Sequence, residues 1–85
     1  MRKIKYFTAS WCGPCQTFKP IMEELLQEGH SVEILDLDEN EELARELQIR
    51  SVPTTIVLED DVEIERFVGV KTKKLILSRL GDNNE

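Results

Sequence analysis

Hydrophobic residues recur along this chain with two periods, one typical of strands and one typical of helices. Four segments rich in β-branched and aromatic residues predict strands. These segments are Lys3–Thr8, Ser31–Leu37, Thr54–Leu58 and Val62–Val68. The second is almost continuously apolar, which favours an interior strand covered on both faces. The last two form an antiparallel hairpin through residues 59–61, and Asp60-Asp61 leaves the turn type open because Asp-Asp is a weaker signal than Asn-Gly.

Apolar residues spaced three and four positions apart predict three helices between and after these strands. Their apolar faces consist of Phe18, Ile21, Met22, Leu25 and Leu26, then Leu43, Ala44 and Leu47, and finally Leu75, Ile76 and Leu80. Gly29 ends the first helix in a left-handed conformation. Asp38 caps the second helix with Glu41 three residues later, and Thr72 caps the third. Pro20 lies inside the first helix and is expected to kink it, because proline donates no backbone hydrogen bond.

The predicted element order is β-α-β-α-β-β-α, which defines an α/β fold. A right-handed crossover makes the first two strands parallel, and the hairpin adds the antiparallel half of a mixed four-stranded sheet flanked by three helices. The 85 residues suffice for one small domain and not for two. We therefore expect a single domain over residues 1–81 and a frayed C-terminal tail over residues 82–85.

Composition and charge narrow the class of function. Apolar residues make up 40% of the chain and charged residues 33%, which excludes a disordered protein. The net charge of −6 argues against nucleic-acid phosphates or an anionic membrane surface as partners. No apolar segment approaches the roughly 18 residues that span a bilayer, and residues 1–10 alternate charged and apolar positions, unlike a secretory signal. We expect a cytoplasmic protein.

The candidate chemistry lies in Trp11-Cys12-Gly13-Pro14-Cys15, which holds both cysteines of the chain. A disulfide across so short a loop constrains the unfolded chain little, so the pair is a poor structural staple. The segment lies where the first strand is expected to end and the first helix to begin. The helix dipole and the unpaired backbone N–H groups at such a position stabilise a thiolate. We therefore expect a lowered pKa for Cys12 and a buried, protonated Cys15.

This spacing brings the two sulfurs within bonding reach and predicts disulfide exchange. The Cys12 thiolate attacks a substrate disulfide, and Cys15 then displaces the substrate from the mixed disulfide, which leaves Cys12 and Cys15 oxidised. A structural zinc site, the main alternative, is short of ligands because the chain adds only the distant His30 to the two cysteines, so no metal is expected. A Cys-His hydrolase would need that same His30 beside Cys12, and nothing in the sequence supports this.

The motif Trp11-Cys12-Gly13-Pro14-Cys15 reads letter for letter like the active site of the thioredoxin family, and the resemblance extends over nearly the whole chain. Pro20 stands where family members carry the proline that kinks the active-site helix. The segment 49–54 resembles the one that leads to the family's cis-proline, and segment 68–70 resembles the loop whose glycine lines the substrate groove. The resemblance implies a thioredoxin-like fold and a protein-disulfide reductase.

The resemblance also implies a binding surface and partners. The residues that match this surface around Cys12 are Trp11, Gly13, Pro14, Val52, Pro53 and Gly69. In the family, the backbone of the residue before the cis-proline pairs with the extended substrate, so Val52 is the expected docking position. The implied protein binds no cofactor itself and carries electrons from NADPH, through a flavin-containing thioredoxin reductase, to disulfide-containing client proteins. We expect it to act as a monomer.

Two departures from the family's pattern affect the chemistry of Cys15. Typical thioredoxins carry a buried aspartate six residues before the first cysteine and a lysine partner on the next strand, whereas this chain has Tyr6 and Ile34 there. An early tryptophan is replaced by Thr8, and we expect a trimmed member of the family, since no part of this sequence matches the family's N-terminal strand and helix. We hypothesise that Cys15 loses its proton to water, to the departing substrate thiolate or to the Tyr6 hydroxyl.

Two other functions stay open at this point. The small size suits a glutathione-dependent glutaredoxin, although Gly13-Pro14 replaces the usual Pro-Tyr and no Gly-Gly motif follows the last strand. The alternative from another class is an accessory binding module of a larger enzyme, with incidental redox chemistry. An isomerase-like oxidant is disfavoured because those proteins usually carry histidine between the cysteines. Finally, Lys19 and the basic first strand would steer acidic clients if they lay near the active-site end.

Overall fold

The computed structural model describes residues 1–81, which contain one mixed sheet of four strands in the order β2-β1-β3-β4. The expected tail at 82–85 lies outside the described residues. The strands are β1 (Arg2–Thr8), β2 (Val32–Asp36), β3 (Thr54–Glu59) and β4 (Val62–Val68). β1 pairs in parallel with β2 and antiparallel with β3, which pairs antiparallel with β4. The predicted mixed α/β sheet is therefore confirmed.

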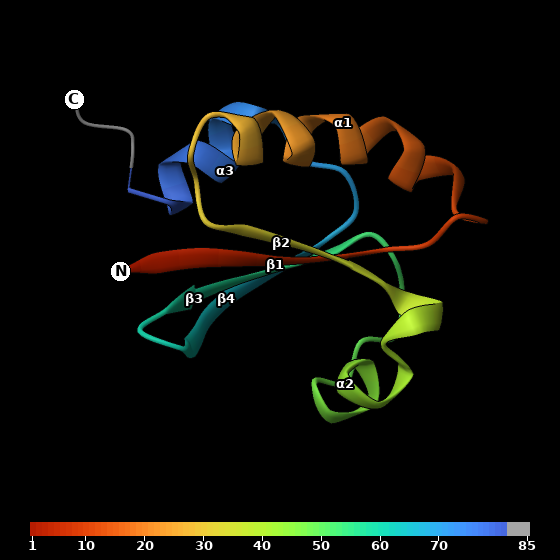
Figure 1. The fold of residues 1–85 in the computed structure, drawn as a ribbon. Helices are drawn as coiled ribbons and strands as arrows, with labels where there is room; N and C mark the ends of the chain where they lie inside the picture. The colour runs from red at the N-terminus through yellow and green to blue at the C-terminus, as the bar shows by residue number, and fades with distance from the viewer. Residues whose placement is uncertain (82–85) are drawn as a thin grey trace.

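Within the same residues, three α-helices cover the two faces of the sheet. They are α1 (Gly13–Gln27), α2 (Glu41–Glu46) and α3 (Lys73–Arg79). α1 and α3 lie on one face and α2 on the other (Figure 1). The predicted cap of α3 is confirmed, because the Thr72 side chain accepts the backbone N–H of Leu75 at 3.1 Å. Pro20 lies inside α1 as predicted.

The prediction that Asp38 caps the second helix is wrong. β2 ends at Asp36, and the Asp36 carboxylate accepts the backbone N–H groups of Asp38 and Glu39 at 2.8 and 3.3 Å. This bonding caps a short 3-10 helix, η1 (Leu37–Glu39), directly after the strand. Asn40 then precedes α2 without a side-chain cap. The chain leaves the sheet one residue earlier than predicted because an aspartate at the strand end competes for those N–H groups.

Two apolar cores lie on opposite faces of the sheet. The core under α1 and α3 contains Ile4, Tyr6, Phe18, Met22, Leu25, Val32, Val57 and Ile76. The core under α2 contains Phe7, Leu35, Ala44, Ile56 and Leu58. One predicted core residue is wrong: Leu26 is 48% exposed. Successive helix residues are about 100° apart, so the burial of Leu25 turns its neighbour Leu26 toward solvent.

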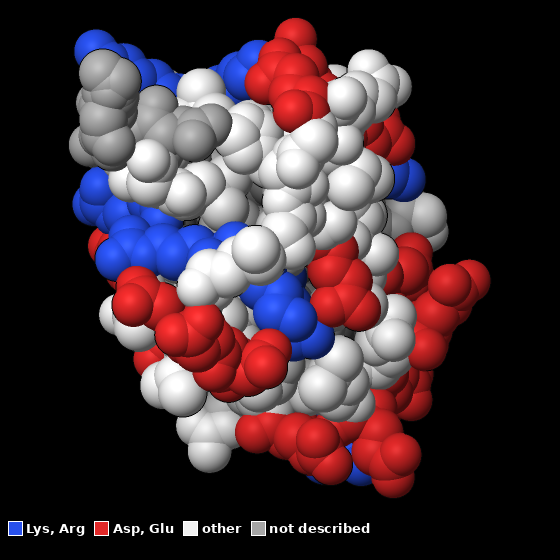
Figure 2. All heavy atoms as spheres, turned by 60° about the vertical axis from the view of Figure 1, so that its left-hand side comes forward, with Lys and Arg blue, Asp and Glu red and all other residues white. Residues whose placement is uncertain are grey.

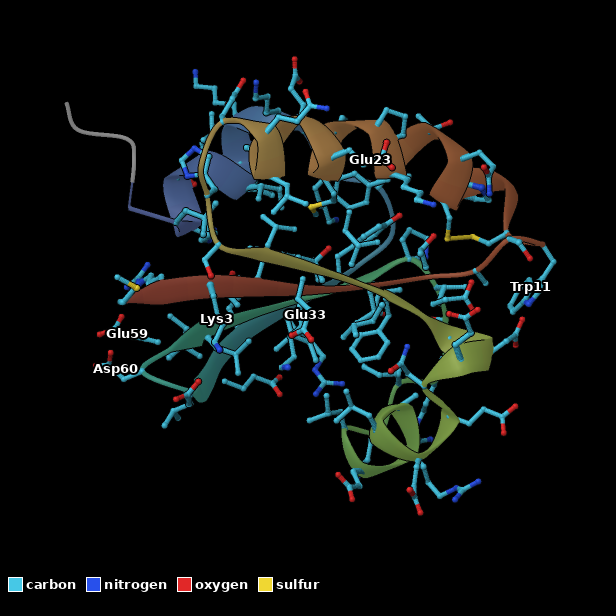
Figure 3. All side chains as sticks on the ribbon, in the orientation of Figure 1. Lys3, Trp11, Glu23, Glu33, Glu59 and Asp60 are labelled. Carbon is cyan, nitrogen blue, oxygen red and sulfur yellow. A yellow bond between two sulfur atoms is a disulfide. The ribbon has the colours of Figure 1, made fainter. Side chains whose placement is uncertain are left out.

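The turn between β3 and β4 is a two-residue loop with positive φ at both central positions. Asp60 has φ 51° and Asp61 has φ 70°, which are typical of a type I′ turn. The turn type, which the Asp-Asp sequence left undetermined, is therefore I′. The Met1 amino group bonds Asp60 at 2.7 Å and Lys3 pairs with Asp61 at 3.1 Å. Lys3 and Asp60 lie together at the end of the sheet remote from Trp11 (Figure 3).

The basic residues at the start of β1 therefore do not lie at the active-site end. Arg2 pairs with Glu59 at 2.8 Å and Lys5 pairs with Glu33 at 2.9 Å. Figure 2 shows basic and acidic side chains side by side on this face of the molecule. The basic first strand was expected to steer acidic clients only if it lay near the active-site end. It does not, because Arg2 and Lys3 lie at the far end of the strand and each faces an acidic partner.

Candidate active site

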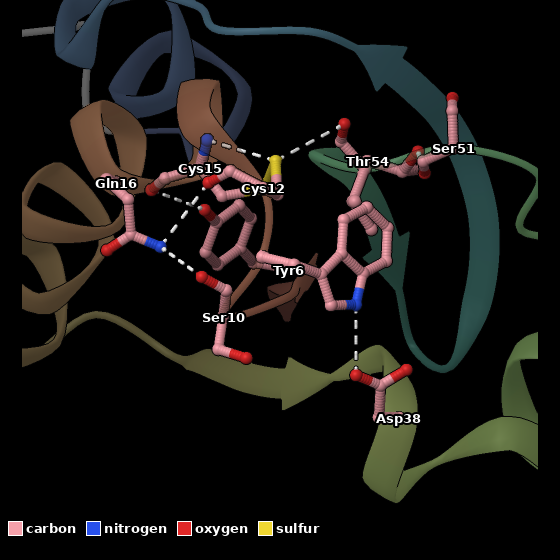
Figure 4. The surroundings of a disulfide bond; sticks show 10 residues. Tyr6, Ser10, Cys12, Cys15, Gln16, Asp38, Ser51 and Thr54 are labelled. Carbon is pink, nitrogen blue, oxygen red and sulfur yellow. Dashed lines mark hydrogen bonds between the residues drawn. A yellow bond between two sulfur atoms is a disulfide. The ribbon is translucent and has the colours of Figure 1, made fainter.

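Cys12 and Cys15 lie where β1 leads into α1, as the sequence predicts. Cys12 is the N-cap residue of α1 in an extended conformation, and its Sγ accepts the backbone N–H of Cys15 at 3.2 Å (Figure 4). Gly13 and Pro14 occupy the first positions of the helix, where a missing proline N–H costs nothing. The two cysteines are joined by a disulfide with a Cα–Cα distance of 5.3 Å. Cys12 Sγ thus takes the place of a capping oxygen, where N–H groups favour negative charge.

The two sulfur-bearing residues differ in exposure. Cys12 is 5% exposed and Cys15 is fully buried. Ala9 packs against both, with Leu37 and Val52 at the edge of the same cluster. Cys12 is thus the sulfur nearer to solvent, while Cys15 is held one helical turn deeper.

Trp11 lies beside this pair and is 63% exposed. Its indole N–H donates to Asp38 Oδ2 at 3.0 Å. Asp38, which the sequence predicts as a helix cap, is thus the hydrogen-bond partner of Trp11. The predicted parallel pairing of β1 and β2 already indicated that Trp11 and Asp38 would be close. The carboxyl ends of parallel strands lie at the same edge of a sheet, so the loops that follow them are neighbours.

Val52 packs against the pair of cysteines, and its neighbour Pro53 is bonded to Gly69. The Val52 carbonyl oxygen lies 3.7 Å from Cys12 Sγ, and the Val52–Pro53 peptide bond is cis. The Pro53 carbonyl accepts the backbone N–H of Gly69 at 2.9 Å. Gly69 has φ 97°, a conformation that side-chain-bearing residues rarely adopt. These contacts tie the loop before β3 to the loop after β4 beside the disulfide.

The residue at the usual aspartate position, Tyr6, is buried beneath Cys15. Its hydroxyl donates to the Cys15 carbonyl oxygen at 3.4 Å. Burial raises the pKa of Tyr6, hydrogen bonding with the Thr8 hydroxyl opposes this shift, and the negative charge of Glu23 adds to it. Ile34 is the neighbour of Tyr6 on β2 and supplies no charge. The tyrosine is therefore a neutral hydroxyl at neutral pH.

Other chemistries lack the groups that they need in residues 1–81. No set of three or more His, Cys, Asp or Glu side chains there could hold a metal ion. His30 follows the opposite end of α1 from Cys12, where its backbone N–H bonds the Leu25 carbonyl. The candidate chemistry therefore lies in Cys12 and Cys15. A sulfur at a helix N-terminus with a buried partner three residues later defines a thiol-disulfide oxidoreductase of the Cys-x-x-Cys class.

The thioredoxin family model matches residues 3–82, and the chain belongs to the thioredoxin family. It is 42% identical to thioredoxin of Mycobacterium tuberculosis over 79 residues, which are 89% of this chain and 68% of that protein. It is equally similar to a bifunctional thioredoxin reductase/thioredoxin of Mycobacterium leprae, 42% over 79 residues, and covers 17% of that protein's length. The solved structure of a mutant thioredoxin from Halobacterium salinarum superposes with a TM-score of 0.86 at 32% identity, covering 99% of this chain and 75% of that chain.

Proposed function

We propose that this thiol-disulfide oxidoreductase is a reducing thioredoxin in which Cys12 attacks the client disulfide and Cys15 resolves the mixed disulfide. One observation carries the assignment of roles. Cys12 Sγ is the N-cap acceptor of α1, bonded by the Cys15 N–H at 3.2 Å, whereas Cys15 is fully buried. A thiolate at a helix N-terminus is stabilised before reaction, which is the property that an attacking thiol needs.

The exchange proceeds in two balanced steps. In the first, the Cys12 thiolate forms a bond to one client sulfur, and the other client sulfur leaves as a thiolate. In the second, Cys15 loses its proton and bonds to Cys12 Sγ, while the bond between Cys12 and the client breaks. Two electrons pass to the client, and Cys12 and Cys15 end as the disulfide that the structure contains.

The proposed client surface consists of Trp11, Gly13, Pro14, Val52, Pro53 and Gly69. The exposed Trp11 ring supplies apolar area on one side of Cys12. The Val52 carbonyl oxygen lies 3.7 Å from Cys12 Sγ, which supports the proposal that an extended client segment pairs with the Val52 backbone. Gly69 adds no side chain to this surface, which leaves room for a client backbone.

We propose that NADPH reduces this protein through a flavin-containing thioredoxin reductase, with no cofactor bound to the chain itself. The Mycobacterium leprae relative supports this pairing, since it is described as a bifunctional thioredoxin reductase/thioredoxin. We further propose a cytoplasmic monomer that serves disulfide-containing client proteins. In residues 1–81, none of the helices combines the length and apolar character that crossing a membrane requires.

A coupled reduction assay tests the source of electrons. The protein is offered a disulfide client with either NADPH and thioredoxin reductase or glutathione and glutathione reductase. We expect turnover with the first system. Turnover with glutathione alone would overturn the thioredoxin assignment in favour of a glutaredoxin-like reductase.

A further inference from the structure

The loop between β1 and α1, residues 9–12, carries the exposed Trp11 and the N-cap residue Cys12. Its turn is closed by the backbone N–H of Cys12, which donates to the Ala9 carbonyl at 3.2 Å. Cys12 is extended, with φ −94° and ψ 116°, and its Sγ accepts the Cys15 N–H at 3.2 Å. The position of Cys12 Sγ at the helix N-terminus therefore depends on the conformation of this loop.

The Gln16 side chain fastens this loop to the helix. Gln16 lies in the first turn of α1. Its amide nitrogen donates to the Cys12 carbonyl at 3.3 Å and to the Ser10 carbonyl at 3.4 Å (Figure 4). A primary amide has two N–H donors, which matches these two acceptors. Because Ser10 and Cys12 flank Trp11, the two bonds hold the chain on both sides of the tryptophan.

The bonds of Gln16 differ from the disulfide in their response to reduction. In the oxidised protein, the bond between Cys12 and Cys15 ties the loop covalently to α1, and reduction breaks that tie. The Gln16 bonds end on backbone carbonyl oxygens and involve no sulfur atom. Opening the disulfide therefore removes neither their donor nor their acceptors. Gln16 is thus suited to keep the loop in place when the cysteines are thiols.

We propose that Gln16 is a positioning residue, which holds the Cys12 thiolate at the N-terminus of α1 after the disulfide opens. There the thiolate keeps the bond from the Cys15 N–H and the favourable end of the helix dipole. A loop without this fastening loses part of that stabilisation, which raises the pKa of Cys12 and slows its attack on a client disulfide. The inference rests on the proposed role of Cys12 as the attacking thiol.

The charged groups around this loop come from three elements. Lys19 on α1 and Asp36 at the end of β2 line a surface hollow together with the loop, and Asp38 on η1 bonds Trp11. The neighbouring Val52 adds a carbonyl oxygen and no charge. These groups are the same in the wild type and in the variants that test the proposal. A difference between their pH profiles is therefore assigned to position 16.

Two neutral substitutions, Gln16→Met and Gln16→Ala, remove the amide donor without adding charge. The rate at which iodoacetamide alkylates Cys12 in the reduced protein is measured against pH, and mass spectrometry identifies the alkylated residue. The equilibrium of the Cys12–Cys15 pair with reduced and oxidised glutathione is measured in the same variants. The matched control is Gln27→Met, since Gln27 is also exposed and lies at the other end of α1.

We expect both Gln16 variants to have a higher Cys12 pKa than the wild type. Alkylation near neutral pH should slow by about two- to fivefold, the range for loss of one or two exposed hydrogen bonds. The glutathione equilibrium should move toward the disulfide by a similar factor, because the reduced form loses the fastening and the oxidised form keeps the covalent tie. Gln27→Met should match the wild type in both measurements.

A glutamine that only added stability would stabilise the oxidised and reduced forms alike. An unchanged Cys12 pKa or an unchanged glutathione equilibrium in either Gln16 variant therefore overturns the inference. If the wild type has a lowered Cys12 pKa and reduces clients, that result leaves the proposed function standing. An ordinary thiol pKa for Cys12 in the wild type would instead overturn its proposed role as the attacking thiol, and this inference with it.

A measurement on the wild type covers the case in which the variants fail to fold. NMR relaxation of the side-chain amide groups is recorded for the reduced protein. We expect the Gln16 amide to be more ordered than the Gln27 amide on the picosecond to nanosecond timescale, because both of its N–H groups are bonded to the loop. Equal mobility of the two amides would overturn the proposal.

Discussion

Trp11 donates its indole N–H to Asp38 Oδ2 at 3.0 Å, and this bond joins the loop after β1 to the 3-10 helix after β2. Both groups are exposed, so the bond contributes little to stability. Its effect is on orientation, because a ring that is 63% exposed has few other contacts to hold it beside Cys12. The carboxylate therefore positions the largest apolar side chain of the proposed client surface.

Removing this acceptor should change the tryptophan more than the fold. We expect Asp38→Ala to lose less than about 1 kcal/mol of stability, to shift the emission of the single tryptophan and to slow client reduction several-fold. Asp38→Asn keeps an acceptor oxygen and serves as the control. Fluorescence anisotropy and client kinetics check the prediction, and identical anisotropy in Asp38→Ala and the wild type would contradict it.

Replacing each cysteine by serine should separate their roles. Cys15→Ser should accumulate a mixed disulfide with a client, because the attacking thiol remains and the resolving thiol is gone. Cys12→Ser should show neither adduct nor turnover, since Cys15 is fully buried. Mass spectrometry under non-reducing conditions detects the adduct. If Cys12→Ser kept the biological function, the protein would instead be an accessory binding module.

Gln48 offers a stabilising substitution. It follows the C-cap of α2 with φ 57°, a left-handed conformation that costs a residue with a side chain about 1 kcal/mol. We expect Gln48→Gly to raise the free energy of unfolding by about that amount in urea titrations. Gly29→Ala is the matched control, since Gly29 has φ 94° and open space around its missing Cβ. It should lose a similar amount for the same reason, and a loss of stability in Gln48→Gly would refute this account.

The ion pair between Glu63 and Arg66 on β4 should make a small contribution that depends on pH. Hydrogen bonding to Arg66, together with its charge, lowers the pKa of Glu63 below its ordinary value of 4.5. A lowered folded-state pKa gives stability that is present above the unfolded-state pKa and lost as pH falls through the folded-state pKa. We expect Glu63→Gln to cost about 0.5 kcal/mol at pH 7, after allowance for solvent screening, and nothing at pH 2. Urea titrations at both pH values measure this, and a cost that persisted at pH 2 would contradict it.

Two neighbouring leucines of α1 should differ sharply in their effect on stability. Leu25 is fully buried in the core under α1 and α3, whereas Leu26 is 48% exposed. We expect Leu25→Ala to cost about 2–5 kcal/mol because it leaves a cavity, and Leu26→Ala to cost under about 1 kcal/mol. Thermal or urea unfolding of both variants provides the comparison. Equal losses would show that the buried face of α1 is wider than described.

The sequence predicted the strands and helices well because their signals are local. Periodic apolar residues identified each element of residues 1–81, apart from η1, with boundaries within a few positions. The predicted Asp38 cap failed because Asp36 and Asp38 are both good capping residues, and only the end of β2 decides which one meets free N–H groups. The sequence did not predict the type of the Asp60-Asp61 turn, because aspartate tolerates positive φ without requiring it.

By itself, the sequence determined the α/β order of elements and the chemistry, since the spacing of Cys12 and Cys15 at a strand-helix junction depends on adjacent residues alone. Only the tertiary structure decided which distant groups surround that pair. The parallel register of β1 and β2 brings Asp38 to Trp11, and the packing of the loop before β3 brings the Val52 carbonyl to 3.7 Å from Cys12 Sγ. These contacts join segments far apart in the chain, and their geometry follows from strand pairing and core packing, which no local pattern specifies.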